Sequence, residues 1–98
     1  MNQLKVENII EVDDTEPSAE ILSGWLVAVG SHQDRQSFSR LFEFFAPRIK
    51  TYMQRLGADS ALAEDLMQDT MVKIWRKAST YDPKRAVPSA WILSLIHI

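Results

Sequence analysis

The sequence predicts an all-α fold, a small bundle of three or four helices preceded by a disordered acidic tail. Apolar residues recur at helical spacing through most of the chain after residue 20, and no run alternates with the period of a β-strand. The chain has 98 residues, of which 46% are hydrophobic, which is enough for one small soluble domain. We therefore expect a flexible acidic tail over residues 1–18 and one helical domain over residues 19–98.

The tail differs from the rest of the chain in charge. The first 20 residues contain one basic residue against six acidic ones, a net charge of −5, whereas residues 21–98 contain ten basic against seven acidic residues, a net charge of +3. The tail lacks periodic apolar residues and ends at Pro17, as disordered segments often do. It either solubilises the chain or screens a basic face of the domain. The weak positive charge of the domain is compatible with nucleic-acid binding but does not require it.

The first expected helix covers residues 20–29, where five apolar side chains recur at helical spacing, and Gly30 follows as a stop signal. The second expected helix begins near Ser37, a favourable N-cap residue, and ends at Gly57. Each carries one apolar face, so we expect both to pack against a common core.

The second expected helix contains a proline and four phenylalanines, which determine its expected shape and its buried face. Pro47 removes one backbone donor and crowds the preceding turn, so we expect a kink or a break near residues 45–46. The phenylalanines are expected to pack in the core, although Phe44 departs from the main stripe and is expected to be partly exposed; they are Phe38, Phe42, Phe44 and Phe45.

The third expected helix begins at Asp59 or Ser60 and ends at about Ser79. Its acidic residues lie in the N-terminal half and its basic residues in the C-terminal half, an order that complements the helix dipole. A turn follows, and Pro88 or Ser89 then begins the last helix. The helical pattern is therefore continuous from the third helix to the end of the chain apart from this turn.

Three polar residues of the third helix, Asp65, Gln68 and Asp69, share one face. Three interpretations of this face are open: an ordinary solvated surface, a site for a hard cation, or an interface that accepts Arg and Lys from a partner. The metal site is the weakest of these, because no histidine or further carboxylate converges at helical spacing.

The turn before the last helix carries two cations, Lys84 and Arg85, flanked by the aromatic residues Tyr81 and Trp91. Single-stranded DNA is bound by such a combination, since cations follow the phosphates and rings stack on unpaired bases. The alternative is that the two rings only hold the turn against the core.

No catalytic constellation is visible, and we expect neither an enzyme nor a bound cofactor. The two histidines, His32 and His97, have no nucleophile or acid placed to form a relay, and the three glycines are isolated. The absence of cysteine excludes disulfides and thiolate zinc sites. No signal peptide or apolar run of about 18 residues is present, so we expect a cytoplasmic protein without membrane insertion.

Several segments, in this order and spacing, resemble region 2 of bacterial sigma factors, in particular the extracytoplasmic-function (ECF) group. They are the run at residues 63–75, the Phe-x-x-Leu-Phe-x-x-Phe-Ala-Pro-Arg pattern at 38–48, the Tyr-Asp-Pro turn at 81–83, and Trp91. The similarity extends over about residues 20–95. It implies a subunit that binds core RNA polymerase and directs transcription initiation.

The resemblance also assigns roles to residues. It implies that Asp65, Gln68 and Asp69 meet the clamp helices of the largest polymerase subunit, while Met71 and Trp75 supply apolar contact. It further implies that the segment with Tyr81, Lys84, Arg85 and Trp91 faces the non-template strand of the melting promoter minus-10 element.

Two competing functions remain open. A helical regulatory module would bind another protein, such as an anti-sigma factor, without direct DNA contact. A metal-dependent hydrolase would use Glu64, Asp65 and Asp69.

The end of the chain departs from the family pattern. The family continues after the tryptophan into a basic helix with an Ala-Arg-Asn step, followed by a second DNA-binding domain. Residues 94–98 are mostly apolar where that step is expected, and the chain ends there. We therefore expect the front portion of such a factor, without the second domain: either a C-terminally truncated product or one whose last few residues come from a foreign reading frame.

Overall fold

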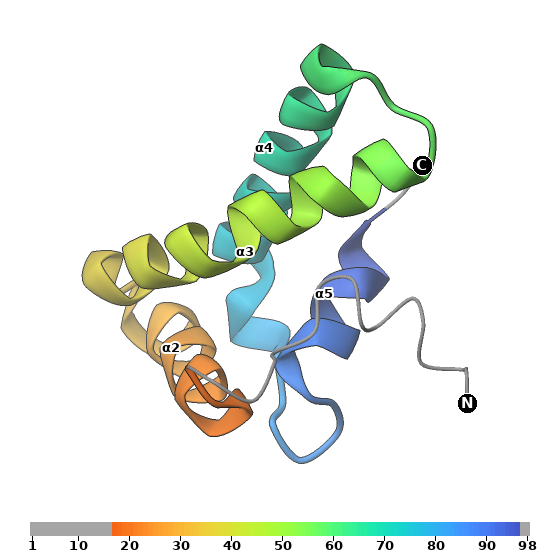
Figure 1. The fold of residues 1–98 in the computed structure, drawn as a ribbon. Helices are drawn as coiled ribbons and strands as arrows, with labels where there is room; N and C mark the ends of the chain where they lie inside the picture. Colours follow the sequence, from red (N-terminus) through yellow and green to blue (C-terminus); the bar gives the residue numbers. More distant parts are fainter. Residues whose placement is uncertain (1–16, 97–98) are drawn as a thin grey trace.

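The computed structural model describes residues 17–96 (Figure 1). These residues form four α-helices and one 3₁₀ turn without any strand: α2 (Ala19–His32), α3 (Arg35–Arg55), α4 (Ser60–Lys77), η2 (Ala78–Thr80) and α5 (Pro88–Leu95). The predicted all-α bundle is therefore confirmed. Most of the predicted tail, residues 1–16, lies outside the described residues, as do residues 97–98.

Helices α3 and α4 form a helical hairpin that organises the fold (Figure 1). The turn between them contains Gly57, whose φ of 112° is accessible to glycine and strained for other residues. Helix α2 packs on α3 and on η2, and α5 packs on α4 and α2. The loop between η2 and α5, the blue loop at the bottom of Figure 1, therefore starts and ends on elements that are fixed to the same bundle.

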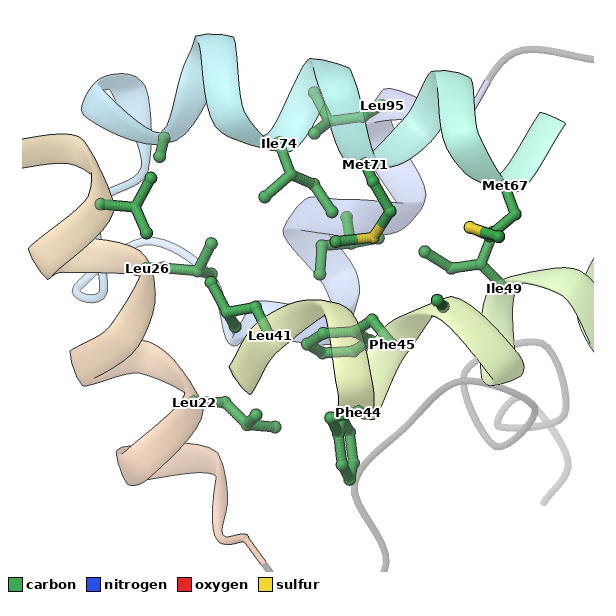
Figure 2. Packing of buried hydrophobic residues seen from close by; sticks show 14 of the residues in the cluster. Leu22, Leu26, Leu41, Phe44, Phe45, Ile49, Met67, Met71, Ile74 and Leu95 are labelled. Atoms are coloured by element: carbon green, nitrogen blue, oxygen red, sulfur yellow. The ribbon is translucent and has the colours of Figure 1, made fainter. Parts of the chain in front are cut away.

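All four helices contribute to one hydrophobic core (Figure 2). Its fully buried side chains include Leu22 and Leu26 from α2, Leu41, Phe45 and Ile49 from α3, Met71 and Ile74 from α4, and Ile92 from α5. Burying this many large apolar side chains is the main source of stability for a domain of this size.

Gly30 does not end helix α2, contrary to the prediction. Ser18 caps the helix by accepting a hydrogen bond from Ile21 N at 3.2 Å, and the helix continues past Gly30 to His32. It ends at Gln33, which has a left-handed φ of 52°. A Cβ atom at Gly30 would lie 2.5 Å from the Ala78 carbonyl oxygen. Glycine is therefore required here for the close approach of α2 and η2, and not as a stop signal.

Two expectations about α3 were wrong. The N-cap is Asp34, whose carboxylate accepts hydrogen bonds from the backbone N–H and the hydroxyl of Ser37, so Ser37 is the third residue of the helix and not its cap. Of the kink or break predicted near residues 45–46, the break does not occur, because α3 continues from Arg35 to Arg55 with Pro47 inside it. Packing of both halves of α3 against the bundle outweighs the lost backbone donor. The Arg48 guanidinium supplies an extra donor in this turn, 2.8 Å from the carbonyl oxygen of Phe44.

The remaining two helices begin as predicted. Asp59 caps α4 by accepting a hydrogen bond from Leu62 N at 2.8 Å, and Pro88 is the first residue of α5. The predicted end of the third helix, at about Ser79, falls within η2. Among the helices of residues 17–96, none combines the length and the apolar character that a membrane span needs.

The phenylalanines of α3 also differ from expectation. Phe44 is buried, with 7% of its surface exposed, whereas Phe42 is 38% exposed. Helix α3 packs on α4 along one side and on α2 along another, so its buried face is wider than a single stripe. Phe44 lies on the added part of this face, with its ring edge-to-face against Phe45 at 4.9 Å.

Candidate functional site

The polar face of α4 is exposed, and no cation of residues 17–96 pairs with its aspartates. Asp65, Gln68 and Asp69 are all solvent-exposed. Within residues 17–96 the single ion pair joins Lys50 to Glu64, so neither Asp65 nor Asp69 is neutralised by the described part of the chain. Their side chains project from the interior of a capped helix and are available to a basic partner.

Gln68 is oriented by a short polar chain that crosses from α3 to α4. Lys50 Nζ lies 3.3 Å from Glu64 Oε1, and Gln68 Nε2 donates to Glu64 Oε2 at 3.0 Å. The amide is thereby held beside the two aspartates. The spacing of Glu64 and Gln68 by four residues is visible in the sequence, but the contribution of Lys50 depends on the packing of two helices and was missed.

An apolar hollow of about 370 Å³ adjoins this polar face. It is lined by Phe38 and Phe42 from α3 and by Gln68, Met71, Val72 and Trp75 from α4. Phe42 and Val72, which both line the hollow, are 38% and 47% exposed, so the hollow presents apolar surface to solvent. Gln68 belongs both to the polar face and to the hollow, so the two form one continuous surface, which we call the α4 face.

Met71 and Trp75 occupy different positions on the α4 face. Met71 is 2% exposed and points into the core, toward Phe45 in Figure 2, so it forms only the floor of the hollow. Trp75 is half-buried and forms a wall, with its ring edge-to-face against Phe38 at 5.1 Å. The most exposed apolar residues of the hollow are Phe42 and Val72; from the sequence, Phe42 was expected in the core and Val72 was not singled out.

The second predicted site is the loop between η2 and α5, and its aromatic residues face inward. Tyr81 is 8% exposed, and its hydroxyl donates to the Ala86 carbonyl at 3.0 Å and lies 3.0 Å from Ser23 Oγ of α2. Its ring lies edge-to-face against half-buried Trp91 at 5.4 Å. This is the geometry expected when aromatic residues hold a turn against the core. Ser23 was not predicted to take part.

The cations of this loop face outward. Lys84 and Arg85 are exposed, and the backbone beneath them is ordered by Asp82. The Asp82 carboxylate accepts from Lys84 N at 2.9 Å, and the Asp82 carbonyl accepts from Arg85 N at 2.9 Å. We call residues 81–87 the basic turn. It offers two positive charges at a fixed position, a suitable arrangement for contacting phosphates.

The structure offers little support for metal chemistry. Within residues 17–96, no group of three histidine, cysteine or acidic side chains is arranged to hold a metal ion. A hydrolase built on Glu64, Asp65 and Asp69 would need such a group. In the structure Glu64 is engaged with Lys50 and Gln68 instead.

Comparisons with known proteins point to one family. Residues 41–97 match the family described as Sigma-70 region 2. The chain is 37% identical over 68 residues to the ECF RNA polymerase sigma factor RpoE of Cereibacter sphaeroides, a stretch that covers 69% of this chain and 38% of RpoE. It is 33% identical over 67 residues to the ECF RNA polymerase sigma factor SigK of Mycobacterium sp. strain KMS, covering 68% of this chain and 35% of SigK.

A solved structure shows the same fold. Rhodobacter sphaeroides SigE, crystallised in complex with the anti-sigma ChrR, superposes with a TM-score of 0.77 at 31% sequence identity, covering 83% of this chain and 47% of SigE. The chain therefore spans less than half the length of these relatives, and the family match at residues 41–97 includes α4 and the basic turn.

Proposed function

Because this chain belongs to the Sigma-70 region 2 family and is an ECF-type sigma factor sequence, we propose that it binds core RNA polymerase through the α4 face and contacts melting promoter DNA through the basic turn. In this proposal it serves as a transcription initiation module and not as an enzyme. The place of action is the cytoplasm, where bacterial polymerase and promoters meet.

The α4 face carries the polymerase-binding part of the proposal. Asp65 and Asp69 are exposed and unpaired in the described part of the chain, directly beside a hollow with exposed Phe42 and Val72. Carboxylates steer a basic partner and fix its register, while an apolar hollow supplies the buried contact that affinity requires. A basic helical partner with one protruding apolar side chain fits both features. The clamp helices of the largest polymerase subunit are the partner that we propose.

The basic turn carries the DNA-binding part. Lys84 and Arg85 are exposed, and in this proposal they contact phosphates of the non-template strand of the minus-10 element. Tyr81 contributes by fixing the shape of the turn, because its ring is buried. Trp91 is half-buried, so part of its ring is accessible, and in this proposal an unpaired base contacts it.

A pull-down of the purified chain with bacterial core RNA polymerase tests the first part. We expect the wild type to be captured and the Asp65→Arg/Asp69→Arg variant to be lost, because four units of charge change on the proposed contact surface. The control Glu20→Arg/Glu43→Arg reverses two exposed acids on α2 and α3 and should bind as the wild type does. Circular dichroism confirms that each variant is folded. Equal capture of the two double variants would refute the assignment to the α4 face.

A second candidate function is regulation by an anti-sigma factor. It is favoured by the similarity to SigE, whose structure was determined with the anti-sigma ChrR. We propose that such a protein covers the α4 face and excludes polymerase. Preincubation with purified ChrR is then expected to reduce capture of core polymerase. If the chain binds ChrR but never polymerase or DNA, the regulatory module is the better description.

A further inference from the structure

A second hollow, of about 260 Å³, lies between the N-terminal end of the domain, α2 and α3. It is lined by Pro17, Trp25, Arg40, Glu43, Phe44 and Arg48, and it shares no residue with the hollow of the α4 face. Two arginines against one glutamate give its lining a positive charge. We call it the arginine groove.

Aromatic rings hold both arginines of the groove. The guanidinium carbon of Arg48 lies 3.7 Å from the centroid of the Phe44 ring, and its Nη1 donates to the Phe44 carbonyl at 2.8 Å. The guanidinium of Arg40 lies 6.0 Å from the centroid of the Trp25 ring. A guanidinium that is already held on a ring loses less conformational freedom when it binds a carboxylate. The groove is therefore organised to receive anions that also carry apolar groups.

We propose that the acidic segment at residues 7–16 of the same chain docks in the arginine groove. This segment contains five acidic residues, no basic residue, and the apolar residues Ile9, Ile10 and Val12. Its composition therefore matches a lining of cations and rings. Carboxylate–guanidinium pairs can be bidentate, which makes arginine well suited to such a ligand.

The connection of the chain favours this occupant over others. Pro17, the residue that directly follows the segment, is itself part of the groove lining. An extended chain spans roughly 3.3–3.6 Å per residue, so Glu16, Asp14 and Asp13 lie within about 15 Å of Pro17. A segment tethered this closely has an effective concentration at the groove on the order of millimolar. A free acidic peptide would need a comparable concentration in solution to compete with it. The docked segment screens Arg40 and Arg48 from other polyanions, independently of polymerase binding.

Nuclear magnetic resonance of the full chain tests this proposal through the Nε–Hε signals of Arg40 and Arg48 and the indole signal of Trp25. We expect Asp13→Asn/Asp14→Asn to shift these signals at 0.1 M NaCl. Raising the salt to 1 M should shift them in the same direction in the wild type, since the screening length falls from about 10 Å to about 3 Å. The matched control Asp65→Asn/Asp69→Asn removes the same charge from α4 and should leave the groove signals in place.

Three outcomes would overturn the proposal. Groove signals that are identical in the wild type and in Asp13→Asn/Asp14→Asn would show that the segment is not there. A shift of equal size in the α4 control would show that the signals respond only to the net charge of the protein. If the salt-induced shift of the wild-type signals is lost on tenfold dilution, the groove binds the acidic segment of a second copy and not that of the same chain. Assignment of the signals uses Trp25→Phe and the single variants Arg40→Gln and Arg48→Gln.

Discussion

The exposed side chains of Asp65 and Asp69 lie in the middle turns of an 18-residue helix. Those of Lys84 and Arg85, by contrast, lie on a turn whose shape depends on one buried tyrosine. On α4 the side chains that face solvent differ from those that build the core, so either set can be changed without the other. In the basic turn, Tyr81 both completes the core and fixes the backbone that carries the cations. Replacing Asp65 and Asp69 should therefore leave the structure intact, whereas replacing Tyr81 should disrupt the turn that carries Lys84 and Arg85.

The largest expected effect is the replacement of Tyr81 by alanine. The change removes a buried ring and its hydrogen bonds to Ala86 and Ser23, and should lower the free energy of unfolding by about 3–5 kcal/mol. Tyr81→Phe keeps the ring and should cost about 1–2 kcal/mol. Asp65→Ala/Asp69→Ala, by comparison, should stay within about 0.5 kcal/mol of wild type. Urea denaturation followed by circular dichroism measures all three. A cost below about 1 kcal/mol for Tyr81→Ala would remove the contrast between the surfaces.

The next effect concerns the hollow of the α4 face. Val72 is 47% exposed, so Val72→Gln should change stability little. If the hollow receives an apolar side chain of the polymerase, the same change should weaken binding by about 1–2 kcal/mol, or roughly tenfold. The matched control is Val27→Gln on α2, where the native valine is 40% exposed. Competition binding to core polymerase measures the affinity of both variants. If Val72→Gln and Val27→Gln bind equally well, the hollow does not contribute and the carboxylates alone account for binding.

A smaller effect is expected from the cations of the basic turn. Lys84→Ala and Arg85→Ala should each remove one phosphate contact, which lowers the slope of log K against log salt concentration for single-stranded DNA by about 0.7. Stability should be unchanged because both side chains are exposed. Arg35→Ala/Arg55→Ala removes two exposed charges from α3 and should reduce binding only through net charge. Fluorescence titrations with single-stranded DNA at several salt concentrations measure this slope for each variant. An unaltered slope in the double variant Lys84→Ala/Arg85→Ala would argue against phosphate contact.

The same two surfaces show which features a sequence reveals. Helical periodicity located every described helix and put Asp65, Gln68 and Asp69 on one exposed face, because side-chain direction along a helix follows from spacing alone. The hollow beside them was not predicted. The exposure of Phe42 and Val72 depends on how α3 packs on α4, and no local pattern encodes that packing.

Tertiary contacts account for the other failures. Gly30 is required by the approach of Ala78, and the anchor of Tyr81 includes Ser23, which lies 58 positions away in the sequence. Local rules assigned Gly30 to a helix end and left the role of Tyr81 undecided between DNA and core. The break predicted near Pro47 is absent for a related reason, because packing along the whole length of α3 outweighs one lost backbone donor.

The smallest expected effect is a pH dependence at one edge of the α4 face. The hydroxyl of Ser37 is the main cause of a lowered pKa of the Asp34 carboxyl, whose ordinary value is 3.8. A carboxyl whose pKa is lowered by folding stabilises the fold above its unfolded pKa, and this contribution is lost as the pH falls through the folded value. Below pH 3.8 the cap of α3 should therefore weaken, and the first turn, which carries Phe38 of the hollow, should fray.

Amide signals of Ser37 and Phe38, followed on acidification, measure this fraying. Asp34→Asn is the matched variant, because asparagine caps a helix about as well as aspartate but has no carboxyl to titrate. Its first turn should keep the same amide signals across the acid range in which the wild type changes. If the two proteins respond alike, another group controls the start of α3. If they differ, the apolar half of the α4 face depends on the half-buried carboxylate of Asp34, much as the basic turn depends on one buried hydroxyl.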